Sequence, residues 1–336
     1  MNSVELTQKD LFVMCSMPGT TDISLYLDEP CGSEKFVIHP FIRYAVKTTH
    51  ISTNEIVINP DFSFQTAETC HISETSKVNY ITQANTLLKE IKANKFQKAI
   101  LSRIKKQAFE SVDYADLFKR IVKQYPKAFT YLFNIPNQGT WIGASPEVLL
   151  QSDAHGFKTV ALAGTLPAEN NTTPEWSQKE INEQQIIVDY VKIKLDEKNI
   201  SYSLNGPKSS RAGNVYHLKS VFESSHKIDP VEVALMLHPG PAISGYPITD
   251  ALDFIAKTEH HNREYYCGFL GPVSQQNTSL YINLRCMRLF ADAACLYVGG
   301  GYTKDSIIEK EWEETELKSQ TLLAVLQDSY IEVDGI

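Results

Sequence analysis

The sequence predicts an α+β fold, in which one large domain holds antiparallel β-sheets covered by helices. Apolar runs of strand length follow one another across short polar turns, a pattern that favours antiparallel pairing over βαβ alternation. Segments with helical spacing lie between these groups of strands. No repeat or low-complexity linker divides the chain, so we expect residues 1–336 to form a single domain, although this length also allows two.

The first part of the chain, residues 1–80, predicts mixed strand and loop. Apolar bursts at 36–38 and 56–58 lie between polar turns. We therefore expect this variable part to add strands to the same sheet assembly as residues 85–326.

Five later segments have apolar residues three to four positions apart, as helices do. They span residues 81–92, 114–124, 174–197, 231–237 and 308–326. In the third segment, Thr173 suits the N-cap and Pro174 suits the first turn, where a missing N–H costs nothing.

Apolar runs that lie between these helices, several of them next to one another, end at turn residues and predict strands. They span residues 98–104, 128–133, 140–150, 158–163, 265–273, 280–290 and 294–298. A polar, glycine-containing connection precedes the short run 215–218. The last strand ends in Gly299, Gly300 and Gly301, whose successive amides can face an anion if they form a loop.

The composition is that of an ordinary globular protein, with 43% hydrophobic and 21% charged residues. A formal charge of −8 argues against nucleic acid or an anionic membrane as the main partner. The six cysteines form no CxxC pair, so neither a disulfide framework nor a zinc site is expected. No leader and no membrane-spanning run are present, and we expect a cytoplasmic protein.

Carboxylates mark one face of the last predicted helix. Glu311, Glu314 and Lys318 lie on one stripe, which Leu322 and Val325 continue. A stripe that starts acidic and becomes apolar leads charge toward the interior.

The helix at 174–197 repeats the pattern, because Glu180 and Glu183 precede an apolar stripe on the same face. A solvated helix face is the alternative for each pair. Four converging carboxylates would instead need a hard divalent cation, and Mg²⁺ fits best because it tolerates few protein ligands.

Ten short motifs follow one another between residues 85 and 326. They are 98–103 (KAILSR), 143–147 (GASPE), 161–165 (ALAGT), 179–183 (KEINE), 217–218 (HL), 238–242 (HPGPA), 263–268 (REYYCG), 284–286 (LRC), 299–301 (GGG) and 311–318 (EWEETELK). In this order they resemble the chorismate-utilising enzymes, a family of isochorismate, salicylate, anthranilate and aminodeoxychorismate synthases. The resemblance implies a fold of two antiparallel β-sheets packed together and flanked by helices, and a monomer.

The resemblance also implies catalytic roles. Lys98 corresponds to the general base that activates water for attack at C2 of chorismate, and Glu147 to the general acid that protonates the departing C4 hydroxyl. A positioned acid and base each contribute about 10² to 10⁴ in rate. Lys98 must then lose a proton easily, whereas Glu147 must keep one, which an apolar or anionic neighbourhood favours.

For binding, the resemblance implies Mg²⁺ held by Glu183 and Glu314, with Glu180 and Glu311 beside them or acting through water. The metal would hold the ring carboxylate of chorismate. The other substrate-binding positions it implies are Thr165, His217, Ala242, Tyr266, Arg285, Gly299, Gly300, Gly301 and Lys318.

Three positions discriminate among the members of this family. Lys98 stands where ammonia-using members carry an amide, which indicates water as the nucleophile. Ala163 stands where aminodeoxychorismate synthases carry a nucleophilic lysine. Ala242 stands at a position where isochorismate synthases resemble this sequence, whereas salicylate synthases tend to have threonine there. Gln184 and Leu166 depart from the common histidine and arginine and leave the electrostatics of the pocket open.

The sequence thus indicates a Mg²⁺-dependent isochorismate synthase, an isomerase that moves a hydroxyl group. The alternatives are a salicylate synthase, which goes on to eliminate pyruvate, and a non-catalytic chorismate-binding protein. The sequence does not distinguish a role in menaquinone synthesis from one in siderophore synthesis.

Overall fold

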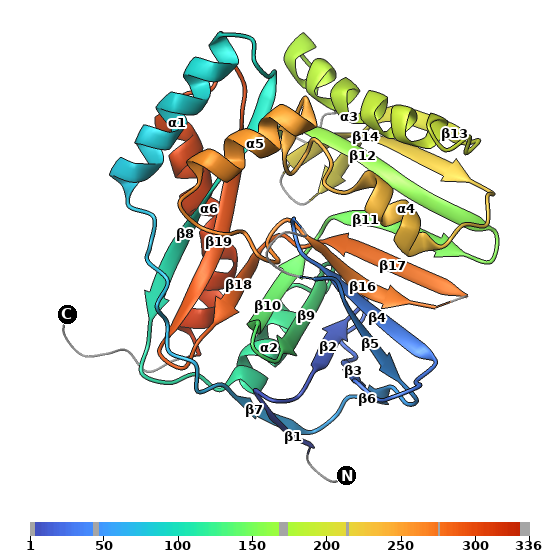
Figure 1. Cartoon of the computed structure of the whole chain (residues 1–336), viewed down its shortest axis with the longest axis vertical. Coiled ribbons are helices and arrows are strands. Elements are labelled where there is room, and N and C mark those ends of the chain that lie inside the picture. The colour runs from blue at the N-terminus through green and yellow to red at the C-terminus, as the bar shows by residue number, and fades with distance from the viewer. Residues whose placement is uncertain (1–3, 43–46, 168–173, 213–214, 275, 330–336) are drawn as a thin grey trace.

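The computed structural model describes residues 4–42, 47–167, 174–212, 215–274 and 276–329, and these form an α+β domain built on two large antiparallel sheets (Figure 1). The helices are α1 (Lys77–Lys92), α2 (Tyr114–Gln124), α3 (Gln178–Asp196), α4 (Pro230–Leu237), α5 (Ile248–Thr258) and α6 (Ile308–Gln327). None of the helices in these ranges is long and apolar enough to span a bilayer.

The larger sheet has nine strands within the described residues. Their spatial order is β15 (Gly245–Tyr246), β8 (Lys98–Ala108), β19 (Ala293–Tyr302), β18 (Cys286–Leu289), β10 (Gly139–Ser145), β9 (Phe129–Ile135), β2 (Phe12–Ser16), β3 (Ser24–Leu27) and β6 (Val57–Ile58). Each neighbouring pair is antiparallel. The first and last parts of the chain therefore meet in one sheet.

The second sheet has eight strands in the same described ranges. Their order is β13 (Ser203–Ala212), β14 (Val215–Ser224), β12 (Gly156–Pro167), β11 (Val148–Asp153), β17 (Asn277–Ile282), β16 (Phe269–Val273), β4 (Glu34–His39) and β5 (Thr49–Thr53). These pairs are also antiparallel, whereas β1 (Val4–Thr7) and β7 (Phe62–Gln65) form a separate parallel pair.

The main core lies between the two sheets. The rings of Phe129 on β9 and Tyr281 on β17 stack at 4.3 Å between centroids and join the sheets. Tyr131 and Phe133 enter the same core, while Leu132 points to a second cluster under α2 and α6. Both faces of the larger sheet are thus buried, because successive side chains of a strand alternate between faces.

The helices cover distinct parts of the two sheets, as Figure 1 shows. α3 lies along β12 and β14, and α6 lies against β19. α1 packs on β8 and α6, and α5 packs on β8 and β15. The two helices that carry the predicted carboxylates therefore approach the site from different sheets.

Two predicted strands were wrong in the same way, because each is two strands that belong to different sheets. The segment 140–150 divides at Pro146, which cannot donate a ladder hydrogen bond, into β10 and β11. The segment 280–290 divides near Arg285, whose φ of 49° interrupts the extended chain, into β17 and β18. Glu147 and Arg285 consequently lie where the chain crosses between the sheets.

The predicted start of the third helix was also wrong. Thr173 lies outside the described residues, and Pro174 precedes the helix, which begins at Gln178. Ser177 is the N-cap and forms a reciprocal capping box with Glu180, a stronger start signal than a proline alone. β13 replaces part of the predicted polar connection, and α5 was missed.

Candidate active site

Lys98 begins β8 and is almost fully buried, with 6% of its surface exposed. Its Nζ donates a hydrogen bond to Oε1 of Glu183 on α3 at 2.5 Å. Its stem passes Gly301 on the neighbouring strand, where an added Cβ would lie 3.0 Å from Cε of Lys98. The lysine therefore points from the larger sheet toward the acidic face of α3.

Glu147 lies just after Pro146 at the crossing between the sheets. Burial raises the pKa of this carboxyl, while the ammonium groups of Lys98 and Lys318 oppose the rise. Glu147 and Ala242 also line one cavity of about 50 Å³. The structure thus brings the predicted acid within electrostatic reach of the predicted base and next to the loop that carries Ala242.

The acidic face of α6 approaches the same lysines. Glu314 accepts from Lys318 at 2.6 Å, and Lys318 also donates to the carbonyl oxygen of Gly299 at 2.9 Å. Glu311 accepts from Oγ of Ser306 at 2.8 Å. Burial raises the pKa of Glu311, and the nearby charge of Glu314 adds to the rise. Negative charge is therefore crowded on this face.

The expected convergence of four carboxylates on one ion is not present. Among the described residues, no three histidine, cysteine, aspartate or glutamate side chains are placed to hold a metal. Glu183 and Glu314 each face a lysine, and Glu180 accepts from the backbone of Ser177 in the capping box. Each of these three carboxylates is therefore paired with a lysine or a backbone amide, and helical spacing could not show which partner it has.

The glycine triplet corrects another expectation, because it lies inside β19 and not in a loop after it. Gly299, Gly300 and Gly301 pair with residues 100–102 of β8. On this side their backbone groups lie in an antiparallel ladder, whereas on the other side β18 pairs only as far as Tyr297 and the carbonyl oxygen of Gly299 accepts from Lys318. The absence of side chains in the triplet also leaves room for two neighbours. A Cβ added to Gly299 would lie 3.0 Å from Oη of Tyr266, and a Cβ added to Gly300 would lie 3.1 Å from Oε2 of Glu311.

Tyr266 lies beside Gly299, and Arg285 lies within electrostatic reach of Tyr266 and Glu314. The guanidinium of Arg285 donates to Oγ1 of Thr321 on α6. Burial lowers the pKa of Arg285, while Tyr266, Tyr125 and Glu314 oppose the decrease. Burial raises the pKa of Tyr266 well above its ordinary value, so its hydroxyl remains a neutral donor. A cation and a phenol therefore lie near the acidic face of α6.

His217 and Thr165 lie on the eight-stranded sheet, where their backbones pair across β12 and β14. His217 contacts the carbonyl oxygen of Gly164 through Nδ1 at 3.0 Å. Gly164 has a φ of 70° at the bulge of β12, and an added Cβ there would lie 3.1 Å from Cβ of Glu180. These predicted positions therefore flank the start of α3.

Sequence reasoning gave no role to Ser306 or to a buried group formed by Ser102, Glu259 and Arg263. Ser306 carried no distinguishing signal. The other group did, because Glu259 and Arg263 are four residues apart and immediately precede an apolar run.

Comparison with solved structures shows the same architecture. The isochorismate synthase DhbC of Bacillus anthracis, described there as putative, aligns with a TM-score of 0.78 at 22% identity and covers 95% of this chain and 96% of that chain. MenF, the menaquinone-specific isochorismate synthase of Escherichia coli, aligns with a TM-score of 0.77 at 18% identity. The alignment covers 96% of this chain and 90% of that chain. At these identities the likeness shows the fold.

Sequence comparison gives similar relatives. Isochorismate synthase EntC of Escherichia coli strain K12 is 29% identical over 241 residues, which are 68% of this chain and 62% of that relative. Isochorismate synthase MenF of Bacillus subtilis strain 168 is 26% identical over 285 residues, or 80% and 59%. The match thus spans about three fifths of these relatives' length.

The family model described as "Chorismate binding enzyme" matches residues 42–327, which include every helix described above and all strands of the two sheets except β2, β3 and β4. The chain therefore belongs to the chorismate-binding enzyme family.

Proposed function

We propose that this protein is an isochorismate synthase, which adds water at C2 of chorismate and releases the C4 hydroxyl. The observation that carries the proposal is the pairing of a buried amine, Lys98, with a carboxyl of raised pKa, Glu147, within electrostatic reach of each other. Reversible displacement of hydroxide needs such an acid and base, because hydroxide is a poor leaving group. The names of the similar proteins agree with this reaction.

Glu147 is suited to protonate the departing oxygen. A carboxyl in a poorly solvated site keeps its proton nearer to neutral pH than an exposed one does. Burial produces this effect here, while Lys98 and Lys318 limit it. In the proposed reaction Glu147 gives its proton to the C4 hydroxyl as the C–O bond breaks.

Lys98 is suited to take the proton from water on the attacking side. In the described arrangement it forms a salt bridge with Glu183 at 2.5 Å, so the ammonium must leave this contact and lose a proton before the neutral amine can take one from water. The missing side chain of Gly301 leaves the lysine stem room to turn, since an added Cβ would crowd Cε. We therefore propose that Glu183 changes partner when the site is loaded.

Glu183 and Glu314, with Glu311 beside them, are the residues that would hold Mg²⁺. The donor chemistry fits, because these are hard carboxylate oxygens. Among the described residues they do not form a three-ligand cluster, so Glu183 and Glu314 would have to leave Lys98 and Lys318 to converge on the ion. Bound there, Mg²⁺ would neutralise the ring carboxylate of chorismate. Glu180 would not be a ligand while it caps α3.

Arg285, Tyr266 and Lys318 would bind the other carboxylate of chorismate. A chain with a formal charge of −8 needs local donors to attract a dianion. Arg285 supplies a guanidinium and Tyr266 a neutral hydroxyl near Gly299, where Lys318 is also anchored. In this proposal they orient the ring between Lys98 and Glu147.

The experiment is to incubate the purified protein with chorismate and MgCl₂ and to separate the products by chromatography. The expected product is isochorismate without pyruvate, and the Glu147→Gln variant is expected to form at least about 100-fold less. Salicylate with equimolar pyruvate would replace the proposal by a salicylate synthase. Binding of chorismate without turnover would identify a non-catalytic binding protein.

A further inference from the structure

The strand that begins with Lys98 has one incompletely paired edge. β19 pairs with β8 from Ala99 to Ala108. On the opposite side, within the described residues, β15 supplies only two paired residues, opposite Lys98 and Ala99. The backbone groups that follow need other partners, because an unpaired buried N–H or C=O is costly.

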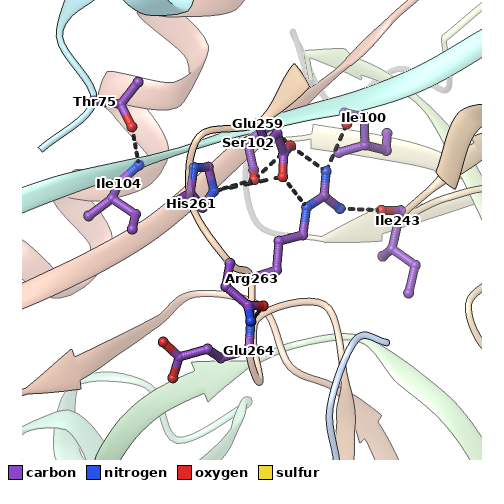
Figure 2. Close-up of polar contacts among 10 residues, drawn as sticks. Thr75, Ile100, Ser102, Ile104, Ile243, Glu259, His261, Arg263 and Glu264 are labelled. Atoms are coloured by element: carbon purple, nitrogen blue, oxygen red, sulfur yellow. Dashed lines mark hydrogen bonds and ion pairs between the residues drawn. The ribbon is translucent and has the colours of Figure 1, made fainter. Parts of the chain in front are cut away.

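Two charged side chains supply these partners in place of a strand (Figure 2). Nη2 of Arg263 donates to the carbonyl oxygen of Ile100 at 2.8 Å. The amide of Ser102 donates to Oε1 of Glu259 at 2.7 Å, and its hydroxyl donates to the same oxygen at 2.9 Å. Thr75 continues the series by accepting from the amide of Ile104 at 3.1 Å. Two backbone contacts complete this edge, since the amide of Ile100 donates to the carbonyl oxygen of Ser244 and the amide of Thr75 donates to that of Ile104, both at 3.0 Å. The edge beside Lys98 is therefore closed by side chains together with single backbone contacts and not by a continuous strand.

The same guanidinium also reaches the loop that carries Ala242. Nη1 of Arg263 donates to the carbonyl oxygen of Ile243 at 2.9 Å. Ile243 directly follows Ala242, and Ile100 lies two residues after Lys98 on the same face of β8. One side chain thus fixes the backbone beside the proposed base and the backbone beside the pocket wall.

Arg263 and Glu259 form a buried, charged ion pair. Arg263 and Glu259 form a fork with contacts of 2.6 and 2.8 Å, and both are buried. Burial alone would raise the pKa of Glu259, but the charge and hydrogen bonds of Arg263 outweigh it and lower the pKa. The guanidinium also lies 4.5 Å from the ring centre of Phe41. Such a bidentate pair holds a geometry that lysine cannot reproduce.

We propose that Arg263 and Glu259 are positioning residues that hold the strand of Lys98 and the loop of Ala242 at a fixed separation. The proposal rests on the isochorismate synthase activity proposed above. Neither residue acts on the substrate, so their loss is expected to lower kcat more than it raises the KM for chorismate. Displacement of a catalytic group by about 1 Å costs up to about 100-fold in rate.

The test compares Arg263→Lys and Glu259→Gln with a matched control, Arg288→Lys. Arg288 also makes a two-partner salt bridge, to Glu264 and Glu68, but it lies on β18. We expect kcat to fall about 10- to 100-fold in the two test variants, with KM changed less than about threefold, and to stay near wild type in the control. Equal kcat in all three variants, or a rise in KM at constant kcat, would refute the positioning role.

Hydrogen exchange gives a readout that does not depend on activity. The amide of Ser102 should exchange at least about tenfold faster in Arg263→Lys than in Arg288→Lys, because only the first loosens the edge of β8. An unchanged exchange rate of the Ser102 amide would contradict the proposed attachment of β8 to Arg263 and Glu259, even if activity fell. If the wild-type protein forms no isochorismate, the proposed function fails. The exchange comparison would still decide whether Arg263 and Glu259 hold the edge of β8.

A milder variant covers the case in which Arg263→Lys does not fold. Ser102→Ala removes the hydroxyl contacts with Glu259 and with Nε2 of His261 at 2.9 Å, and leaves the amide contact with Glu259 in place. It should lower kcat about two- to fivefold at constant KM and speed exchange of residues 100–102. If both kcat and the exchange rates stay at their wild-type values, the proposal is refuted.

Discussion

Replacing Lys98 with glutamine should weaken catalysis and strengthen Mg²⁺ binding at the same time. Lys98 is the present partner of Glu183, at 2.5 Å, so the lysine and the metal would compete for one carboxylate. A variant that removes the competitor leaves Glu183 free to accept the metal. A loss of the base alone would change turnover without changing the metal affinity.

The contact gives the size of the effect. The side chains are 8% and 29% exposed, so the hydrogen bond is largely shielded from water. A hydrogen bond to a charged group contributes about 1.5 to 3 kcal/mol. Since about 1.4 kcal/mol corresponds to tenfold in affinity, Mg²⁺ should bind about 10- to 100-fold more tightly to Lys98→Gln. Turnover should fall by about 10² to 10⁴ when the base is lost.

Isothermal titration of Mg²⁺ measures the affinity without needing turnover, and product chromatography measures the rate. Glu314→Gln serves as the control, because it removes a proposed ligand and should bind Mg²⁺ more weakly than wild type. Metal affinity in Lys98→Gln that equals or falls below the wild-type value would refute the competition. Near-normal turnover in Lys98→Gln would refute the base assignment.

Three further outcomes are expected. Lys318 lowers the pKa of Glu147, which must be protonated to act. The Lys318→Met variant should therefore move the alkaline limb of the pH–kcat profile to higher pH, and an unmoved limb would assign that limb to another group. Gly301→Ala should lower kcat, by up to about 100-fold, with little change in unfolding midpoint, because the new Cβ crowds the proposed base at 3.0 Å; unchanged kcat would show that the stem needs no such space. Thr315→Val should lower the free energy of unfolding in urea by about 1 to 3 kcal/mol, because Nε of the buried Arg103 loses its acceptor; an unchanged midpoint and slope would contradict that accounting.

Local patterns predicted five of the six helices in the described residues, although α1 begins at Lys77 and not at residue 81, and α5 was missed. The segment 114–124 coincides with α2, and 308–326 falls one residue short of α6. Both have apolar residues at helical spacing, a property of a few consecutive turns. The start of α3 was missed because the Ser177 and Glu180 capping box was overlooked in favour of Pro174.

Strand boundaries depended on the rest of the molecule. Residues 140–150 form one apolar run, yet Pro146 divides it between two sheets, and only the partners of each half decide which sheet it joins. β13 has a polar sequence and is a strand because β14 supplies its ladder. Pairing partners lie far away in the chain, so periodicity alone does not define them.

The sequence by itself indicated the family and the α+β class, because ten short motifs and the apolar patterns are local features. The candidate acid and base came from the resemblance to that family, and the candidate carboxylates also from their helical spacing. The tertiary structure decided which charges meet. It paired Lys98 with Glu183 and placed Glu147 where the chain crosses between the sheets. It also placed the glycine triplet where Tyr266, Glu311 and Lys98 leave no room for a side chain, and it brought Arg263 and Glu259 to the edge of β8. These are contacts between residues distant in sequence, and their geometry follows from how two sheets pack, which no local pattern encodes.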